Sequence, residues 1–139
     1  MPILTLKTTA TVSDEQAQSM MRQLSQLSTR ILNKRAEVTA CVFEVIPAGR
    51  WWVGGESGAS VQAQLSIQVT QGTNTRDEKQ RFVQQAYEVL QAHLSEPSLN
   101  PICYVSVLEV PADGWGYGGL TQQQRSQMAH PVPPLVKLY

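Results

Sequence analysis

The sequence predicts an α+β fold, a two-layer α/β sandwich in which a four-stranded mixed sheet carries two helices on one face. Three observations lead to this prediction. The chain contains a strand–helix–strand pattern twice, each helix begins at a capping box, and each closing strand runs into Pro-Ala and, soon after, Gly and Trp. Self-similarity on this scale outweighs any single motif, so we interpret the chain as a tandem βαβ repeat.

The 139 residues correspond to about one domain, which is long enough to bury a core without metals or disulfides. We therefore predict a single domain over 1–139. Residues 2–58 form its first repeat and residues 59–119 its second. Residues 120–139 are polar and then proline-rich, and we expect an extended C-terminal tail that lies over another subunit.

The first repeat opens with alternating apolar and polar residues over 3–8, as in a strand with one buried face. Ser13 and Gln16 have the spacing of a capping box, so a helix should start there. A second strand over 38–46 is stopped by Pro47. Between them, apolar residues recur at helical spacing and predict one core-facing stripe: Ala17, Met20, Met21, Leu24, Leu27 and Ile31.

The second repeat follows the same plan, with strands over 61–70 and 102–110 and a capping box at Thr75 and Glu78. A strand–helix–strand crossover is right-handed and makes its strands parallel, so both helices should lie on one face of the sheet. The apolar stripe of the second helix is Phe82, Val83, Ala86, Val89, Leu90 and Leu94.

The other face of the predicted sheet needs cover, because the strands are apolar on both sides in places. The residues concerned are Val42, Phe43, Val45, Val105, Val107 and Leu108. We expect other copies of the chain to cover this face in a closed symmetric oligomer. Segments 50–58 and 113–119 combine aromatic residues with glycines, which predicts loops or hairpins near a pocket or in a subunit interface.

Composition argues against several classes of partner. Eleven basic and eleven acidic residues cancel, so neither nucleic acid nor an acidic membrane is expected. No apolar run reaches the roughly 18 residues of a membrane span and no stretch resembles a signal peptide, so we expect a cytoplasmic protein. Cys41 and Cys103 lie in apolar runs without metal-ligand spacing and are interpreted as buried thiols. No motif indicates a metal or other cofactor.

The candidate catalytic residue is Pro2, which follows Met1 and precedes an apolar strand. Removal of Met1 leaves a secondary amine, which acts as a base or a nucleophile. An ordinary α-amino group titrates at about 7.7–8.0, and apolar surroundings lower its pKa because they disfavour the ammonium form. Many chains begin Met-Pro without such chemistry, so this interpretation depends on the rest of the sequence.

Together with the doubled repeat, these residues resemble the tautomerase superfamily, as a fused chain of the 4-oxalocrotonate tautomerase type. The stretches from Pro47 to Gly55 and from Cys103 to Ala112 are similar to parts of the cis-3-chloroacrylic acid dehalogenase and macrophage migration inhibitory factor families. The resemblance covers residues 2–119. It implies a homotrimer in which Pro2 is the catalytic base.

The resemblance also implies substrate-binding residues. Lys34 and Tyr104 match a lysine and a pocket tyrosine of the migration inhibitory factor family, and Arg76 lies near the place of an arginine pair in the dehalogenase family. Trp115 and Tyr117 supply apolar walls that favour a flat or aryl substrate.

Several polar residues of the dehalogenase family are replaced in this chain. Residues 70–74 stand in place of the arginine pair, Ser28 in place of a histidine, and Gly116 or Tyr117 in place of a water-activating glutamate. Asp113 is the acidic residue closest in sequence to that last position. Chemistry that needs an activated water is therefore disfavoured.

The expected function is an isomerase that interconverts the enol and keto forms of a 2-oxo acid such as an aryl pyruvate, with Pro2 as general base. One alternative is a Pro2-dependent hydratase, dehalogenase or decarboxylase of small unsaturated acids. The other is a trimeric interaction protein of the same fold without an enzymatic role.

Overall fold

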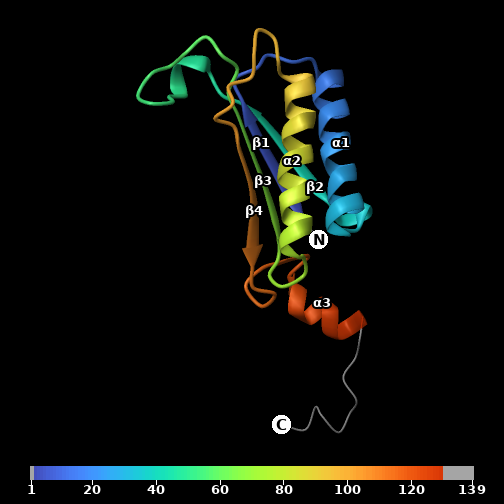
Figure 1. The fold of residues 1–139 in the computed structure, drawn as a ribbon. Coiled ribbons are helices and arrows are strands. Elements are labelled where there is room, and N and C mark those ends of the chain that lie inside the picture. Colours follow the sequence, from blue (N-terminus) through green and yellow to red (C-terminus); the bar gives the residue numbers. More distant parts are fainter. Residues whose placement is uncertain (1, 130–139) are drawn as a thin grey trace, which may run out of the picture.

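The computed structural model describes residues 2–129, which form two layers (Figure 1). Figure 1 shows α1 and α2 together on one face of the sheet, as predicted. The first repeat comprises β1 (Ile3–Thr8), α1 (Asp14–Leu32) and β2 (Ala40–Val45), and the second comprises β3 (Ala63–Thr70), α2 (Arg76–His93) and β4 (Tyr104–Val110). The predicted fold class, two βαβ units in one α/β sandwich, is confirmed.

The sheet has the strand order β2-β1-β3-β4. Each repeat contributes one parallel pair, β1 with β2 and β3 with β4. The two repeats meet in the middle, where β1 and β3 are antiparallel and Ile3 lies opposite Gln68. The sheet is therefore mixed, and an approximate two-fold axis between β1 and β3 relates the repeats.

Both helices begin where the capping boxes predict. The Ser13 hydroxyl accepts a hydrogen bond from the Gln16 backbone N–H, and the Gln16 side chain accepts one from the Ser13 backbone N–H. Thr75 and Glu78 make the same reciprocal pair at the start of α2. The hydrogen bond from the Thr75 backbone N–H, followed by that from Asn74, holds the pKa of the Glu78 carboxyl below its usual range.

The core lies between the helices and the sheet. Val83 is an exception to the predicted stripes, because it is exposed on α2. The largest fully buried apolar side chains come from both repeats: Leu4, Leu6, Met20, Leu24, Leu32, Leu65, Ile67, Val69, Phe82, Leu90 and Leu94. Burying each of these side chains stabilises the fold by about 1.5–3 kcal/mol. Because they come from both repeats, the two repeats share one core.

Three strands begin two residues later than predicted. Residues before β2 form a short 3-10 turn, Ala36–Val38, instead of extended strand. Val61 pairs with the loop before β4, where its N–H donates to the Ser98 carbonyl at 2.7 Å. Local hydrogen bonds outside the sheet therefore replace the first strand pairs.

The two cysteines are less buried than predicted. Cys41 is exposed, so its assignment as a buried thiol is wrong, and Cys103 is half-buried. Both belong to the outer strands or their approaches, where a neighbouring strand covers only one side. Desolvation still raises the pKa of the Cys103 thiol to about 11.

The face of the sheet away from the helices is also less apolar than predicted. Phe43, Val105 and Val107 pack against the core between sheet and helices, so they do not contribute to the open face. Val42 and Leu108 are exposed. Small polar residues that neighbour one another on β1, β3 and β4 occupy the middle of this face: Thr5, Ser66 and Ser106.

The segment after β4 is not extended over residues 120–129. It forms a hairpin, β5 (Gly116–Tyr117) and β6 (Leu120–Thr121), followed by α3 (Gln122–Ala129). The Thr121 hydroxyl accepts from the Gln124 backbone N–H at 3.0 Å, and the Gln124 side chain accepts from the Thr121 N–H at 2.9 Å. This third capping box starts a helix that was not predicted, because the segment is polar and lacks an apolar stripe. The rest of the predicted tail, 130–139, lies outside the described residues.

Within residues 2–129, none of the helices has both the length and the apolar character needed to cross a membrane. In the same range, His, Cys, Asp and Glu side chains form no group of three or more suited to a metal ion.

Candidate active site

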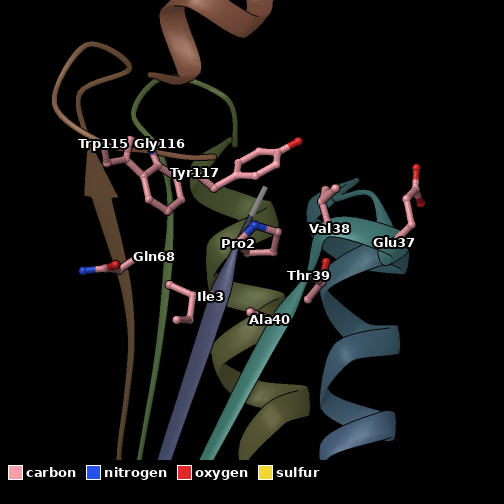
Figure 2. Close-up of a pocket in the computed structure, with 10 residues that line it drawn as sticks. All are labelled: Pro2, Ile3, Glu37, Val38, Thr39, Ala40, Gln68, Trp115, Gly116 and Tyr117. Atoms are coloured by element: carbon pink, nitrogen blue, oxygen red, sulfur yellow. The ribbon is translucent and has the colours of Figure 1, made fainter. Parts of the chain in front are cut away.

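A cleft of about 710 Å³ opens at the end of the sheet where β1 begins. Figure 2 shows Pro2 at its base, with the Tyr117 ring above it and Trp115 to one side. We call it the Pro2 cleft. Its lining residues are Pro2, Ile3, Glu37, Val38, Thr39, Ala40, Gln68, Trp115, Gly116 and Tyr117.

The sheet fixes Pro2 in place. The Pro2 carbonyl accepts a hydrogen bond from the Ala40 N–H at 3.1 Å, so the chain is held to β2 before β1 begins. Ile3 is paired with Ala40 on one side and Gln68 on the other. Pro2 is buried. Its backbone is thus anchored by a central strand, and its ring faces apolar neighbours.

The hairpin after β4 supplies the aromatic wall. Gly118 and Gly119 adopt positive φ values of 62° and 84°, which the two-residue turn requires. A Cβ at position 116 would lie 1.9 Å from the Leu120 carbonyl oxygen, so only glycine lets the hairpin close. The Trp115 indole N–H donates to the Thr70 hydroxyl at 3.2 Å, which ties the wall to the end of β3.

Arg125 on α3 holds the second aromatic ring. Its guanidinium carbon lies 3.7 Å from the centre of the Tyr117 ring, and its NH2 group donates to the Tyr117 carbonyl at 2.8 Å. Arg125 was not among the predicted site residues, because an extended tail was expected over 120–139. The Thr121–Gln124 capping box was the signal that places Arg125 on a helix.

The Pro2 cleft is almost uncharged. Its one lining carboxylate, Glu37, lies 2.8 Å from the Arg35 guanidinium. Hydrogen bonds to the backbone N–H of Glu37 itself and to Arg35 lower the pKa of this carboxyl. Among the described residues, the lining contains no Lys, Arg or His. The apolar part of this lining favours a neutral amine over an ammonium group, whereas the Glu37 carboxylate, although paired with Arg35, favours the ammonium form.

Lys34 lies at the same end of the molecule but does not line the cleft. It is 8% exposed, and its Nζ donates to the Thr73 hydroxyl at 2.9 Å in the loop between β3 and α2. Desolvation lowers the pKa of the Lys34 amine, although Glu78 and Glu109 oppose this shift.

The other two predicted binding residues also lie outside the Pro2 cleft. Arg76 is the exposed first residue of α2. Tyr104 begins β4 at the opposite end of the sheet and is 69% exposed. The structure therefore brings together Pro2, Trp115 and Tyr117 in one chain, and leaves Lys34, Arg76 and Tyr104 outside the cleft.

Tyr104 lines a separate hollow of about 410 Å³, which we call the Trp52 cleft. The loop after β2 forms its other wall, and Figure 1 shows this loop at the end of the sheet away from the N-terminus. The cleft is lined by Trp51, Trp52, Val53, Gly54, Gln64, Ile102 and Tyr104.

No family model and no curated protein matches the sequence. Solved structures do match. A native fused 4-OT superimposes with a TM-score of 0.79 at 17% identity, covering 89% of this chain and 98% of that one. A wild-type fused 4-OT described as an asymmetric trimer gives 0.75 at 20% identity, covering 88% and 98%. A member of the cis-3-chloroacrylic acid dehalogenase family gives 0.72 at 18% identity, covering 96% and 94%.

A macrophage migration inhibitory factor-like protein from Entamoeba histolytica is also similar, with a TM-score of 0.71 at 14% identity over 86% of this chain and 97% of that one. These proteins share one architecture, the doubled βαβ sandwich. At such identities, the likeness establishes the fold of the chain, whereas its chemistry depends on the side chains in the cleft.

Proposed function

Because the chain has the fold of the tautomerase superfamily in its fused form, we propose that it is an isomerase that interconverts the enol and keto forms of a 2-oxo acid. The observation that carries this proposal is the position of Pro2, buried at the base of an apolar cleft beneath the Tyr117 ring. This surrounding suits a neutral amine that exchanges one proton with a bound substrate.

The proposed reaction needs one base and no water. With Met1 removed, the neutral Pro2 nitrogen accepts the enol O–H proton, and the carbonyl forms as the double-bond electrons move to the adjacent carbon. The Pro2 ammonium then returns the proton to that carbon. The apolar lining favours the neutral amine, so Pro2 is ready to accept the proton near neutral pH.

The cleft favours a flat substrate with few charges. Trp115 and Tyr117 offer ring faces for an aryl group, as in a phenylpyruvate-like acid. Among the lining residues within 2–129, the Gln68 amide and the Tyr117 hydroxyl are side-chain donors with no hydrogen bond to another described residue, so they are available to bind the carboxylate or the 2-oxo group. The Thr39 hydroxyl already donates to the Arg35 carbonyl at 2.7 Å.

We also infer a homotrimer in the cytoplasm. Fused 4-OT proteins of this fold form trimers, and the exposed Val42 and Leu108 on the open sheet face offer apolar surface for a second copy. Cys41 and Cys103 are free thiols, which suits a reducing compartment.

The decisive experiment compares the wild-type protein with Pro2→Ala in an ultraviolet assay of phenylenolpyruvate ketonisation. Intact mass first establishes that Met1 is absent. We expect the substitution to lower kcat/KM by about 100-fold, in the range of general base catalysis. Pro47→Ala, at an exposed proline after β2, is the matched control and should keep full activity.

Three results would overturn this proposal in different directions. Retained Met1, or equal activity of Pro2→Ala, would exclude the Pro2 amine as base. Chloride release from a haloacrylate would favour the dehalogenase alternative, although Glu37, the carboxylate in the cleft, is bound to Arg35 and poorly suited to activate water. No turnover of any 2-oxo acid would favour an interaction protein.

A further inference from the structure

Trp115 depends on outside contacts for its position in the Pro2 cleft. It lies in the connection between β4 and β5, where it belongs to neither a helix nor a strand. It lines the Pro2 cleft and also a second hollow of about 290 Å³, next to Leu120 and Thr121. Because Trp115 borders open space at both hollows, packing alone does not fix the angle of its ring.

Two hydrogen bonds hold Trp115. Its carbonyl accepts from the Gln122 backbone N–H at 2.9 Å, which fixes the main chain against α3. Its indole N–H donates to the Thr70 hydroxyl at 3.2 Å, which fixes the side chain. Because a tryptophan side chain turns about only two bonds, a hydrogen bond to its ring sets the direction of the whole indole.

β3 brings Thr70 to this position. Thr70 is the last residue of the strand and pairs with Val110 of β4. Gln68 comes two residues earlier, so its side chain lies on the same face of the sheet, and it lines the cleft. Figure 2 shows Gln68 and Trp115 on the same side of Pro2. One strand thus supplies a polar group of the cleft and the anchor of its aromatic wall.

The backbone around Thr70 is held firmly. The Thr73 hydroxyl donates to the Thr70 carbonyl at 2.6 Å, and the Lys34 Nζ donates to the Thr73 hydroxyl at 2.9 Å. The next residue, Gln71, donates its N–H to the Val110 carbonyl at 2.8 Å. These bonds fix the end of the strand, so the Thr70 hydroxyl stays within reach of the indole.

Thr8, which ends β1, shows the ordinary use of such a hydroxyl. Thr8 is buried, donates to the Gln62 carbonyl at 2.7 Å and accepts from the Ala10 N–H at 3.1 Å. Both partners are backbone groups, the common choice for side-chain hydrogen bonds. The Thr70 hydroxyl instead binds a side chain in the wall of the candidate site. This difference indicates that Thr70 shapes the cleft.

We propose that Thr70 is a positioning residue that makes the Pro2 cleft selective for aryl substrates. Its hydroxyl holds the Trp115 indole at the angle at which the ring face packs on an aryl group. A substrate with a small alkyl group in this place gains little from that contact. The reaction rests on the proposed isomerase function, whereas the hold on Trp115 is measurable without turnover.

The experiment uses the full-length protein and three threonine variants. Thr70→Val removes the hydroxyl at nearly constant volume, and Thr70→Ser keeps it. Thr11→Val, at an exposed threonine before α1, is the control. In deuterium oxide, enolisation followed by ketonisation exchanges the protons next to the 2-oxo group for solvent deuterium. Proton NMR measures this exchange for phenylpyruvate and for 2-oxobutanoate, an alkyl counterpart.

We expect Thr70→Val to raise KM for phenylpyruvate about fivefold, the effect of one neutral hydrogen bond, with kcat within about twofold. KM for 2-oxobutanoate should stay unchanged, because no aryl group meets the indole. Thr70→Ser and Thr11→Val should behave like wild type. Trp115→Phe keeps an aromatic ring but loses the indole N–H, so it should give a similar rise in KM.

A second measurement follows the indole N–H signal of Trp115 by 1H–15N NMR, with Trp115→Phe to assign it. In Thr70→Val this N–H should exchange with solvent faster than in wild type. Titration with 3-phenylpropanoate, which has no 2-oxo group to enolise, should shift the signal in wild type. Its affinity should fall about fivefold in Thr70→Val. Butanoate should leave the signal in place.

Several results would overturn the role of Thr70. An unchanged KM for phenylpyruvate in Thr70→Val is one, and an equal rise for both substrates is another, because it would indicate a general loss of structure. A further contrary result is that Thr70→Val still raises KM in the Trp115→Phe background, since the two changes remove one interaction. An unchanged exchange rate of the indole N–H would also count against it.

The two proposals fail separately. If the wild-type protein exchanges the protons of no 2-oxo acid, the isomerase function is wrong. The indole N–H signal and the affinity for 3-phenylpropanoate then still decide whether Thr70 positions Trp115 for an aryl group.

Discussion

The Pro2 cleft and the Trp52 cleft lie at equivalent strand starts in the two repeats, but they differ in the residues that precede the strand. At β1 the chain reaches Pro2, whereas at β3 it passes through Gln62 and Ala63 as a continuous backbone. The first cleft is nearly uncharged around its proline, and the second is flanked by Lys7 and Arg50. Duplication of a frame thus duplicates walls and a hollow, while in the proposed mechanism only Pro2 supplies an amine.

The largest expected effect comes from a change that makes the Pro2 cleft resemble the Trp52 cleft. Extending the chain by a glycine before Pro2 converts its amine to an amide, as at Ala63. We expect ketonisation of phenylenolpyruvate to fall by about 100-fold or more, because an amide nitrogen is not a base. An unchanged melting temperature is the control. Full activity of the extended protein would disprove the role of the amine.

Arg125 has no counterpart at the Trp52 cleft, so its removal tests how the first cleft is held together. Arg125→Ala loses the cation–π contact with Tyr117 and the hydrogen bond to its carbonyl. We expect KM to rise about fivefold with a smaller change in kcat, because the aryl wall is less well positioned. Arg125→Lys should recover part of the loss. A fall in kcat alone would argue against a positioning role.

Lys34 follows the end of α1, and α2 has no buried lysine in the equivalent place. Because desolvation lowers the pKa of Lys34, the folded protein loses this proton at a lower pH than the unfolded chain, whose lysine titrates near 10.5. The free energy of unfolding should therefore gain from this group as pH rises through that window. Lys34→Met should remove this gain, as measured by urea denaturation at several pH values.

The same variant separates two roles for Lys34. Its Nζ is bound to Thr73 and lies outside the Pro2 cleft, so we expect kcat/KM of Lys34→Met to stay within about threefold of wild type, the scale of an indirect effect. A loss of tenfold or more would instead support the substrate-binding role implied by the family resemblance.

The smallest expected effect compares the two thiols. Desolvation raises the pKa of both thiols, and that of Cys103 reaches about 11, but Cys41 on β2 is the more exposed of the two. At pH 8 iodoacetamide should modify Cys41 about tenfold faster, because the thiolate is the reactive form. Mass spectrometry of Cys41→Ser and Cys103→Ser measures each rate, and denatured protein should show equal rates. Faster reaction at Cys103 in the folded protein would contradict its burial.

Much of the fold was predictable because local signals agreed with one another. The capping boxes at Ser13 and Thr75 fix both helix starts, and the apolar stripes that follow fix most of the helix faces. The exposure of residues on the outer strands was predicted less well. Cys41 is exposed because β2 is an outer strand, and strand order is not encoded in the residues of that strand.

The sequence by itself determined the doubled βαβ unit, the helix caps and the choice of Pro2 as the candidate base, because these depend on residues close together along the chain. Only the tertiary structure decided which side chains surround Pro2. It brought Trp115 and Tyr117 to the proline and set Arg125 behind Tyr117. It also left Lys34 bound to Thr73 and Tyr104 at the other end of the sheet. The physical reason is that strand pairing and packing join residues more than 100 positions apart, and no local pattern records that distance.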